Sequence, residues 1–197
     1  IGILAKDAGL SYNVKWRAGC PAYAGLMPLN YKGEEVEIDE ECPQVNDAIL
    51  DEADNYGAIV LAGYWSLTDI KGDRYFFVTN ANPEPPQANS NANIAAGLRE
   101  TLRRITKAGS TPVLIYDNPQ VEKRDFKCSR MNLLPFHDEP CSFPLSYVEE
   151  QQRLKRALFA QLADEFPQLK FIDPNSLLCS KESCYTELEG VPLYRDD

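Results

Sequence analysis

The residues best placed for chemistry follow short apolar runs, where a parallel sheet would present them along one edge. Gly63-Tyr64-Trp65-Ser66 follows the longest apolar run, and Asp117-Asn118-Pro119 follows a later one. Asp173-Pro174-Asn175 and Ala18-Gly19-Cys20-Pro21 take corresponding places in the chain. Ligands of open α/β folds bind beyond the carboxyl ends of the strands, so these four segments form the predicted site.

Two of these segments contain side chains with a clear chemical use. Tyr64 and Trp65 could stack on a sugar ring, and they could equally close the top of an apolar core. Asp117 and Asn118 stand where an active-site residue could sit, but Asp-Asn-Pro is also an ordinary turn. Residue type alone leaves both interpretations open for each pair.

The common catalytic and cofactor motifs are missing from the sequence. It has no Gly-x-Ser-x-Gly elbow, no phosphate-binding Gly-rich loop and no Gly-x-Gly-x-x-Gly segment. The single histidine, His137, lies between two cysteines, a setting more typical of a surface or packing residue than of a base. We therefore predict neither a cofactor nor a metal site.

The elements that would position these residues alternate along the chain. Helical patterns cover 1–9, 43–55, 93–108 and 146–166, and strand patterns cover 12–16, 57–65, 111–116 and 169–172. The helix from Ser146 has Glu149 three residues on, a capping-box pattern. Long loops are expected over 18–41, 67–91, 117–145 and 173–197, the last with a hairpin near Gly190. Strands that alternate with helices and read as apolar runs predict an α/β fold, a three-layer α/β/α sandwich with a mainly parallel sheet.

Length and charge narrow the class of protein. The chain has 197 residues, enough for one domain with a substantial core, and 44% of them are hydrophobic. A formal net charge of −10 argues against a protein that neutralises nucleic-acid phosphates. No apolar run approaches the roughly 20 residues that span a bilayer.

Six cysteines fall into three local couples: Cys20 with Cys42, Cys128 with Cys141, and Cys179 with Cys184. Six cysteines allow 15 pairings, so the sequence alone does not fix one. The sequential pairing is favoured because each couple lies in a segment rich in turn residues, and because the rigid predicted helices and strands contain no cysteine. Zinc is the alternative, but the spacing is not that of a zinc knuckle. Disulfides imply an oxidising compartment.

Short segments spread over the whole chain resemble one known family. They are Leu4-Ala5-Lys6, Ala8-Gly9-Leu10, Gly19-Cys20-Pro21, Ile59 to Ser66, Pro112 to Ile115, Cys128-Ser129-Arg130, and Cys179 to Cys184 leading into Gly190 to Asp197. In order and spacing they are similar to the extracytoplasmic SGNH-hydrolase-like domain of bacterial acyltransferase-3 enzymes, which O-acetylate surface glycans. The resemblance implies an SGNH, flavodoxin-like fold over residues 1–197.

The resemblance also implies where a catalytic triad would lie. In this family a Gly-Asp-Ser-His segment with the nucleophilic serine precedes the helix that residues 1–9 resemble, and Asp-x-x-His-Leu-Ser follows the Pro-Leu-Tyr strand. On that register the 197 residues form a single domain truncated at both ends, without the nucleophilic serine or the histidine. If one residue lies between Asp197 and the His, the triad Asp is Asp196. If two residues lie between them, the triad Asp is Asp197. The Asp would orient the imidazole that deprotonates the serine.

Two further residues match the family's oxyanion-hole positions. Gly19 corresponds to the Gly after the second strand, and its backbone N–H is the expected donor. Trp65 stands where SGNH hydrolases have Asn in Gly-x-Asn-Asp, so its indole N–H is the second candidate. Tyr64, Trp65 and Asn118 are the candidate substrate-binding residues.

The function implied by the resemblance is transfer of an acyl group, acetyl by expectation, to a cell-surface polysaccharide such as lipopolysaccharide O-antigen. A membrane acyltransferase domain N-terminal to this chain would deliver the acyl donor and anchor the protein in the bacterial inner membrane, with this domain on the periplasmic side. The 197 residues alone are expected to be inactive. The alternatives are a non-catalytic glycan-binding domain, which Tyr64, Trp65 and Tyr75 would suit, and a free secreted carbohydrate esterase.

Overall fold

The central element is a sheet of three parallel strands. The computed structural model describes residues 8–15, 17, 20–32, 35–63, 65, 76–79, 90–120, 142–188 and 191–193. Within these ranges β3 (Ala58–Leu61), β5 (Thr111–Ile115) and β7 (Lys170–Ile172) pair in the order β3-β5-β7. The register aligns Leu61 with Leu114 and Ile115 with Ile172, so all three carboxyl ends meet at one edge. The predicted α/β class with a mainly parallel sheet is confirmed.

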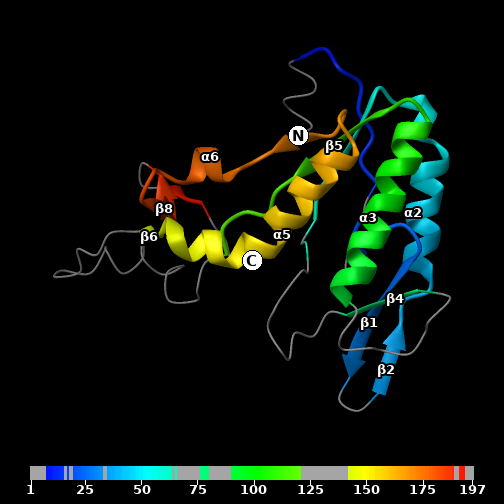
Figure 1. Cartoon of the computed structure of the whole chain (residues 1–197), viewed down its shortest axis with the longest axis horizontal. Coiled ribbons are helices and arrows are strands. Elements are labelled where there is room, and N and C mark those ends of the chain that lie inside the picture. The colour runs from blue at the N-terminus through cyan, green and yellow to red at the C-terminus, as the bar shows by residue number, and fades with distance from the viewer. Residues whose placement is uncertain are drawn as a thin grey trace.

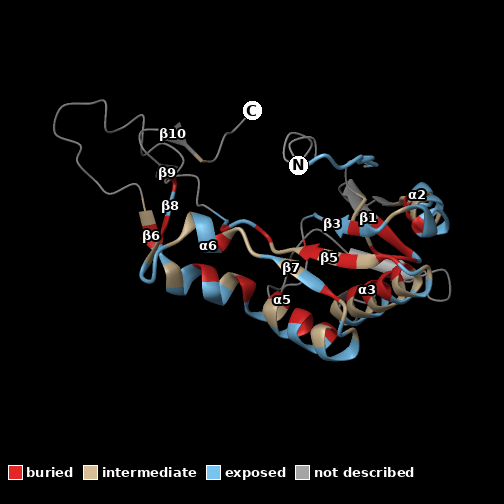
Figure 2. Ribbon diagram, turned by 90° about the horizontal axis from the view of Figure 1, so that it is seen from above, coloured by how far each residue is buried: buried red, intermediate tan, exposed pale blue. Residues whose placement is uncertain are grey.

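The described part of the chain contains three long helices. They are α2 (Glu41–Asp51), which the 3₁₀ turn η1 (Ala53–Asn55) follows, α3 (Ser90–Lys107) and α5 (Leu145–Glu165). Figures 1 and 2 show α3 and α5 on the same side of the sheet. The sequence predicted all three, with boundaries one to four residues away. Gly109 ends the α3 region with a φ of +85°, a conformation that favours glycine.

The core lies between the sheet and these helices. Ile59, Leu61 and Leu114 point into it, where they join apolar residues of α3 and α5. Burial therefore alternates along β3 and β5, and Val60, on the opposite face, is 44% exposed. The apolar runs predicted helices on both faces, but in the described part of the chain the buried face is the one that α3 and α5 cover.

A second sheet forms where the sequence predicted only loop. Strand β1 (Leu26–Lys32) pairs antiparallel with β2 (Glu35–Ile38) and with β4 (Phe76–Thr79), in the order β2-β1-β4. The loops predicted over 18–41 and 67–91 were wrong at these strands. Met27-Pro28 reads as a turn signal, but Pro28 lies within β1, where its carbonyl accepts a hydrogen bond from the Asp39 backbone N–H.

The strand predicted over 12–16 is also wrong for residues 12–15, which have no strand pairing. Asn13 donates to the Tyr56 hydroxyl over 3.2 Å, and Lys15 pairs with Glu52. Tyr12 and Val14 remain 55% and 63% exposed. Alternation of apolar residues predicts a strand only where one face becomes buried, and here that burial does not occur.

Short elements flank the segment from α5 to β7: β6 (Ser142–Pro144) precedes α5 in the chain, and the others follow β7. They are β6 paired with β8 (Ser183–Tyr185), helix α6 (Asn175–Leu178), and the hairpin of β9 (Glu187–Leu188) with β10 (Val191–Pro192). The hairpin confirms the turn predicted near Gly190. Figure 1 shows β6, β8 and α6 together, far from α2 and α3.

The start of α5 differs from the sequence prediction. Ser146 was predicted as the N-cap, but it lies inside the helix, which Pro144 precedes without a side-chain cap. The Leu145 backbone N–H instead donates to the Glu182 carbonyl over 2.8 Å. A tertiary hydrogen bond satisfies the helix terminus, and the local capping pattern could not reveal that.

Two of the three predicted disulfides are confirmed. Cys20–Cys42 has a Cα–Cα distance of 5.4 Å, and Cys179–Cys184 has one of 3.9 Å. Cys128 and Cys141 lie outside the described residues. The first bridge fastens the segment after Gly19 to α2, and the second closes the turn that joins α6 to β8.

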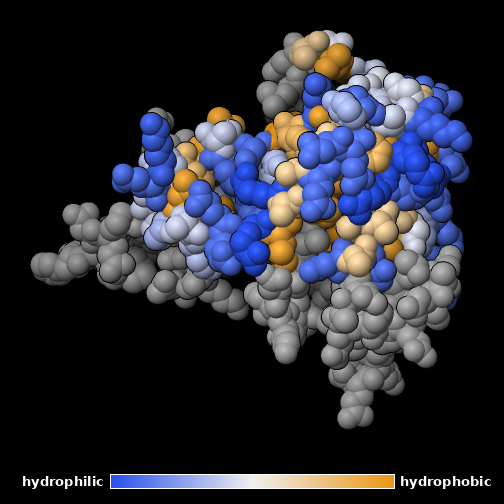
Figure 3. Space-filling view, in the orientation of Figure 1, coloured by the Kyte–Doolittle hydropathy of each residue, from blue (hydrophilic) through white to orange (hydrophobic). Residues whose placement is uncertain are grey.

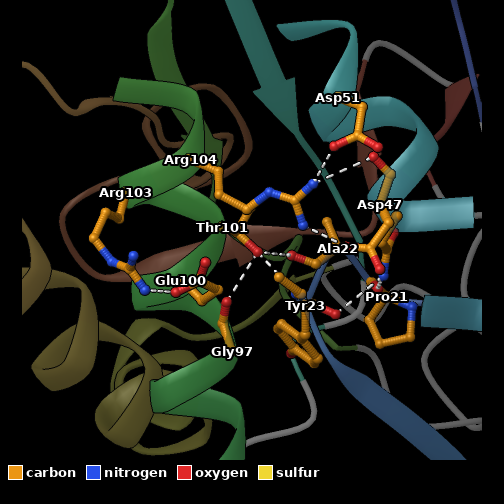
Figure 4. Close-up of polar contacts among 12 residues, drawn as sticks. Pro21, Ala22, Tyr23, Asp47, Asp51, Gly97, Glu100, Thr101, Arg103 and Arg104 are labelled. Carbon is orange, nitrogen blue, oxygen red and sulfur yellow. Dashed lines mark hydrogen bonds and ion pairs between the residues drawn. The ribbon is translucent and has the colours of Figure 1, made fainter. Parts of the chain in front are cut away.

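Polar contacts hold the Pro21–Ala24 segment against α3. The buried Thr101 hydroxyl accepts from the Ala24 backbone N–H over 2.9 Å and lies within hydrogen-bond distance of the Ala22 and Gly97 carbonyls. Figure 4 shows Thr101 facing this segment while Arg104, one turn along, reaches α2. There it pairs with Asp47 and Asp51. The segment that leads away from Gly19 is therefore fixed to two helices.

The described surface is largely hydrophilic. In Figure 3, blue side chains cover most of the described part of this face, and apolar patches are scattered between them. Among the described residues, no helix combines the length and apolar character that crossing a membrane requires.

Candidate functional site at the carboxyl edge of the sheet

Trp65 lies just beyond β3 and is fully buried. Its indole N–H donates to the Ile115 carbonyl over 2.7 Å, and its backbone N–H donates to Asp117 Oδ1 over 3.2 Å. Its ring meets Phe159 edge-on at 5.5 Å and Tyr23 at 5.9 Å. Trp65 therefore ties the end of β3 to the end of β5.

A buried ion pair supports this connection from α5. Lys155 Nζ contacts Asp117 Oδ2, and both side chains are only 7% exposed. Asp117 thus receives a backbone N–H on one carboxylate oxygen and an ammonium group on the other. Burial raises the pKa of Asp117, while Lys155 and the Trp65 N–H oppose that rise.

Gln152, one turn before Lys155, connects the ends of β5 and β7. Its Nε2 donates to the Asp117 carbonyl over 2.9 Å. Its Oε1 accepts from Asn175 Nδ2 over 2.7 Å and from Arg156. A single buried amide therefore joins the loop after β5 to the start of α6.

Arg156 completes the polar layer at this edge. Its Nη2 lies 2.9 Å from Asp173 Oδ2, and its guanidinium carbon lies 4.7 Å from the centre of the Tyr116 ring. Burial raises the pKa of the Tyr116 hydroxyl, so this tyrosine stays neutral at physiological pH. The edge is thus a preorganised layer of charges and amides held in place by α5.

A pocket of about 490 Å³ opens beside this layer, between the first half of α5, the start of α6 and the Cys179–Cys184 turn. Arg156, Asp173 and Asn175 belong to both the polar layer and the pocket lining. The site predicted after β7 therefore has a cavity next to it.

The structure places the predicted site residues unequally. Trp65 lies in the polar layer, while Asn118 is exposed and follows the buried Asp117. Gly19, Tyr64, Asp196 and Asp197 lie outside the described residues, as do His137 and Tyr75. Their predicted roles stay predictions.

The indole N–H of Trp65, predicted as an oxyanion donor, is already hydrogen-bonded to a protein carbonyl in the structure. Both of its N–H groups already donate within the fold, and its ring offers no surface on which a sugar could stack. While the bond to Ile115 holds, the indole N–H is not free for a substrate oxyanion. The structure thus gives Trp65 a positioning role.

Gln152, Lys155 and Arg156 were missed by sequence reasoning, although a signal was present. The buried stripe of α5 runs through Val148, Gln152, Lys155, Phe159 and Leu162. A lysine and a glutamine on an otherwise apolar helix stripe are expensive to bury unless they have partners. Such an interruption indicates a polar layer under the helix.

Among the described residues, no group of three or more His, Cys, Asp or Glu side chains could hold a metal ion. The layer offers hydrogen bonds and one buried ion pair instead.

The fold and this edge define an α/β domain with its polar residues beyond the carboxyl ends of parallel strands. A family model described as "SGNH domain (fused to AT3 domains)" matches residues 1–197, so the chain belongs to this family. No curated protein matches the chain, and no solved structure does either.

Membership in this family gives the coarse function. The chain is an acyltransferase-associated SGNH domain, and the family supports acyl-transfer or esterase-type chemistry. The two disulfides and the fusion to acyltransferase-3 domains are consistent with an extracytoplasmic domain of a membrane protein.

Proposed function

We propose that this domain transfers an acetyl group to a hydroxyl of a bacterial cell-surface polysaccharide, on the periplasmic side of the inner membrane. The observation that carries the proposal is the match of the whole chain to the SGNH domain that occurs fused to acyltransferase-3 domains. The attached membrane domain would supply the acyl group and the membrane anchor.

The proposed reaction uses a serine nucleophile in two steps. The serine hydroxyl attacks the acyl carbonyl, its proton passes to the histidine, and the donor's leaving group departs with that proton. A polysaccharide hydroxyl then attacks the acyl-serine carbonyl while its own proton passes to the histidine. The bond between the acyl carbon and the serine oxygen breaks, and the histidine gives that proton to the serine oxygen. Asp196 or Asp197 would hold the imidazole in the reactive orientation.

The described residues contribute scaffolding to this reaction. The Gly19 N–H is the proposed oxyanion donor, and the adjacent segment is fixed by Cys20–Cys42 and by Thr101. Preorganised donors stabilise a developing oxyanion because they need not reorient during the reaction. The Trp65–Asp117–Lys155 contacts would keep the neighbouring strand ends in register.

Two adjacent aspartates allow a matched test. The intact protein, with its acyltransferase-3 domain, would be supplied with labelled acetyl donor, and label on the polysaccharide would be counted for Asp196→Asn and Asp197→Asn. One variant should lose about 10⁴-fold in rate, the loss known for the corresponding change in a Ser-His-Asp protease. The other should stay near the unmodified rate, because only one of the two aspartates can occupy the triad position. Full activity in both variants would contradict the proposal.

The isolated 197 residues give a second test. They contain neither Gly-Asp-Ser nor Asp-x-x-His, so the chain by itself should not hydrolyse p-nitrophenyl acetate. Hydrolysis that a serine-directed reagent abolishes would contradict the assignment of the nucleophile.

The aromatic residues Tyr64 and Tyr75 are the feature that favours a second candidate, a non-catalytic glycan-binding domain. This candidate predicts polysaccharide binding and unchanged acetylation in both aspartate variants.

A further inference from the structure

The pocket beside α6 has the dimensions and position of a ligand site. Its volume of about 490 Å³ falls within the range of roughly 300–1,000 Å³ that is typical of small-molecule sites. It lies past the end of β7, next to the polar layer. Asp173 and Asn175, which directly follow β7, form part of its wall.

The charges of the lining balance. Arg156 pairs with Asp173 over 2.9 Å, so neither is an uncompensated charge. The remaining charged side chains are Glu149 and Lys181, one of each sign, and both are exposed. The pocket therefore offers no net electrostatic attraction to an anionic or a cationic ligand, and a neutral polar ligand needs none.

The lining combines hydrogen-bonding groups with an apolar wall. Leu145 and the disulfide at Cys179, both half-buried, supply apolar surface. Ser176 and Ser180 supply hydroxyl groups. This mixture of apolar surface, donors and acceptors matches the carbon-bound hydrogens and hydroxyls of a sugar ring.

Asn175 adds an unpartnered acceptor. The residue is only 7% exposed, and its Nδ2 is fixed by the bond to Gln152. Its Oδ1 is buried and has no hydrogen-bond donor in the described part of the chain. A buried acceptor without a donor is destabilising, and a ligand hydroxyl that donated to it would remove that cost.

We propose that this pocket is a binding subsite for a neutral saccharide unit, held by Asn175, Arg156 and the serine hydroxyls against the wall of Leu145 and Cys179. The proposal deepens the proposed function, because the saccharide would be part of the acceptor polysaccharide. Binding does not itself require acyl transfer, so it can be measured without an acyl donor.

The test uses two bulky substitutions on adjacent residues of α6. Ser176 lines the pocket, whereas Leu177 is 84% exposed and is not part of the lining. Ser176→Trp should fill the pocket, and Leu177→Trp adds the same ring outside it. Ser176→Ala removes the hydroxyl without adding bulk, which separates occlusion from the loss of the bond to the Asp173 carbonyl.

The measurement is NMR titration of the full chain with D-galactose and N-acetylglucosamine, and with glucuronic acid and inorganic phosphate as anionic probes. We expect a neutral sugar, at a dissociation constant on the order of millimolar, to shift the amide signals of Ser176, Ser180 and Lys181. Ser176→Trp should weaken this binding by about tenfold or more, Ser176→Ala should weaken it by about two- to tenfold because one hydroxyl partner is lost, and Leu177→Trp should change it by less than about twofold.

Three results would overturn the proposal. They are no shift with either neutral sugar, equal weakening in both tryptophan variants, and binding of glucuronic acid or phosphate in preference to the neutral sugars. None of them bears on the aspartate test of acyl transfer, so failure of the subsite and failure of the proposed function remain distinguishable.

Discussion

Lys155→Met removes the positive member of the buried pair that supports the carboxyl edge of the sheet. Methionine has a similar length and no charge, so the change leaves the α5 packing nearly intact. Asp117, with a side chain that is 7% exposed, then keeps only the Trp65 N–H as a partner for its carboxylate. Removing one member of a buried pair typically costs about 3–5 kcal/mol, because the other charge remains buried and uncompensated.

That loss is a large part of the stability of a domain, which is about 5–15 kcal/mol. For a chain of this size, each kcal/mol lowers the melting temperature by roughly 2–4 °C, so we expect a fall of about 6–20 °C. Lys107→Met, at an exposed position at the end of α3, is the matched control and should change the unfolding free energy by less than about 0.5 kcal/mol.

The loss should depend on pH in a defined direction. Burial already raises the pKa of Asp117 above its unfolded value, and removing Lys155 removes the main opposing influence. A raised folded-state pKa gives a contribution to stability that is complete below the unfolded pKa and is lost as pH rises through the folded pKa. The destabilisation by Lys155→Met should therefore be greatest at neutral pH and shrink toward about pH 4.

Urea unfolding at several pH values measures this effect. Asp117→Asn combined with Lys155→Met removes both charges, so the double variant should be more stable at neutral pH than Lys155→Met alone. A destabilisation below about 1 kcal/mol at neutral pH, or one that does not change with pH, would refute the assignment of a buried, coupled pair.

Three further predictions concern the supports of the fold. Cys20→Ala should lower the unfolding free energy by about 3 kcal/mol and Cys179→Ala by about 2 kcal/mol, as measured by calorimetry. The difference follows from the sequence separations of the two bridges, which are 22 and 5 residues, and a reversed order would contradict the loop-entropy argument. Thr101→Val should cost about 1–3 kcal/mol because the Ala24 N–H loses its acceptor, and chemical denaturation that showed no loss would disprove that role. Gly109→Ala should cost about 1 kcal/mol, since its φ is +85°, and an unchanged melting temperature would count against it.

The sequence predicted the parallel strands and the long helices because their apolar patterns are local. It did not predict β1, because Met27-Pro28 is locally a turn signal and the pairing that overrides it comes from Glu35–Ile38 and Phe76–Thr79. The opposite error concerns Tyr12 and Val14. Alternation of apolar and polar residues there predicted a strand, but both side chains remain exposed. Strand formation depends on partners distant in the sequence.

The site was predictable in position and less so in composition. Asp117 and Asp173 were found because they follow strands, which is a rule of topology. Lys155 and Gln152 come from a helix that packs over that edge, so their partners appear only once the helix is docked. The hydrogen bond of the Trp65 indole N–H could not be predicted for the same reason, because the Ile115 carbonyl that accepts it lies 50 residues away in the sequence.

Trapping the acyl-enzyme tests the proposed acyl transfer most directly. The intact protein, with its acyltransferase-3 domain, would be incubated with acyl donor in the absence of polysaccharide, quenched, digested and analysed by mass spectrometry. We predict one acetyl group on the serine of a Gly-Asp-Ser segment ahead of Ile1, and its loss when polysaccharide is added. Acetylation of polysaccharide at the normal rate after that serine is replaced by alanine would contradict the proposed function.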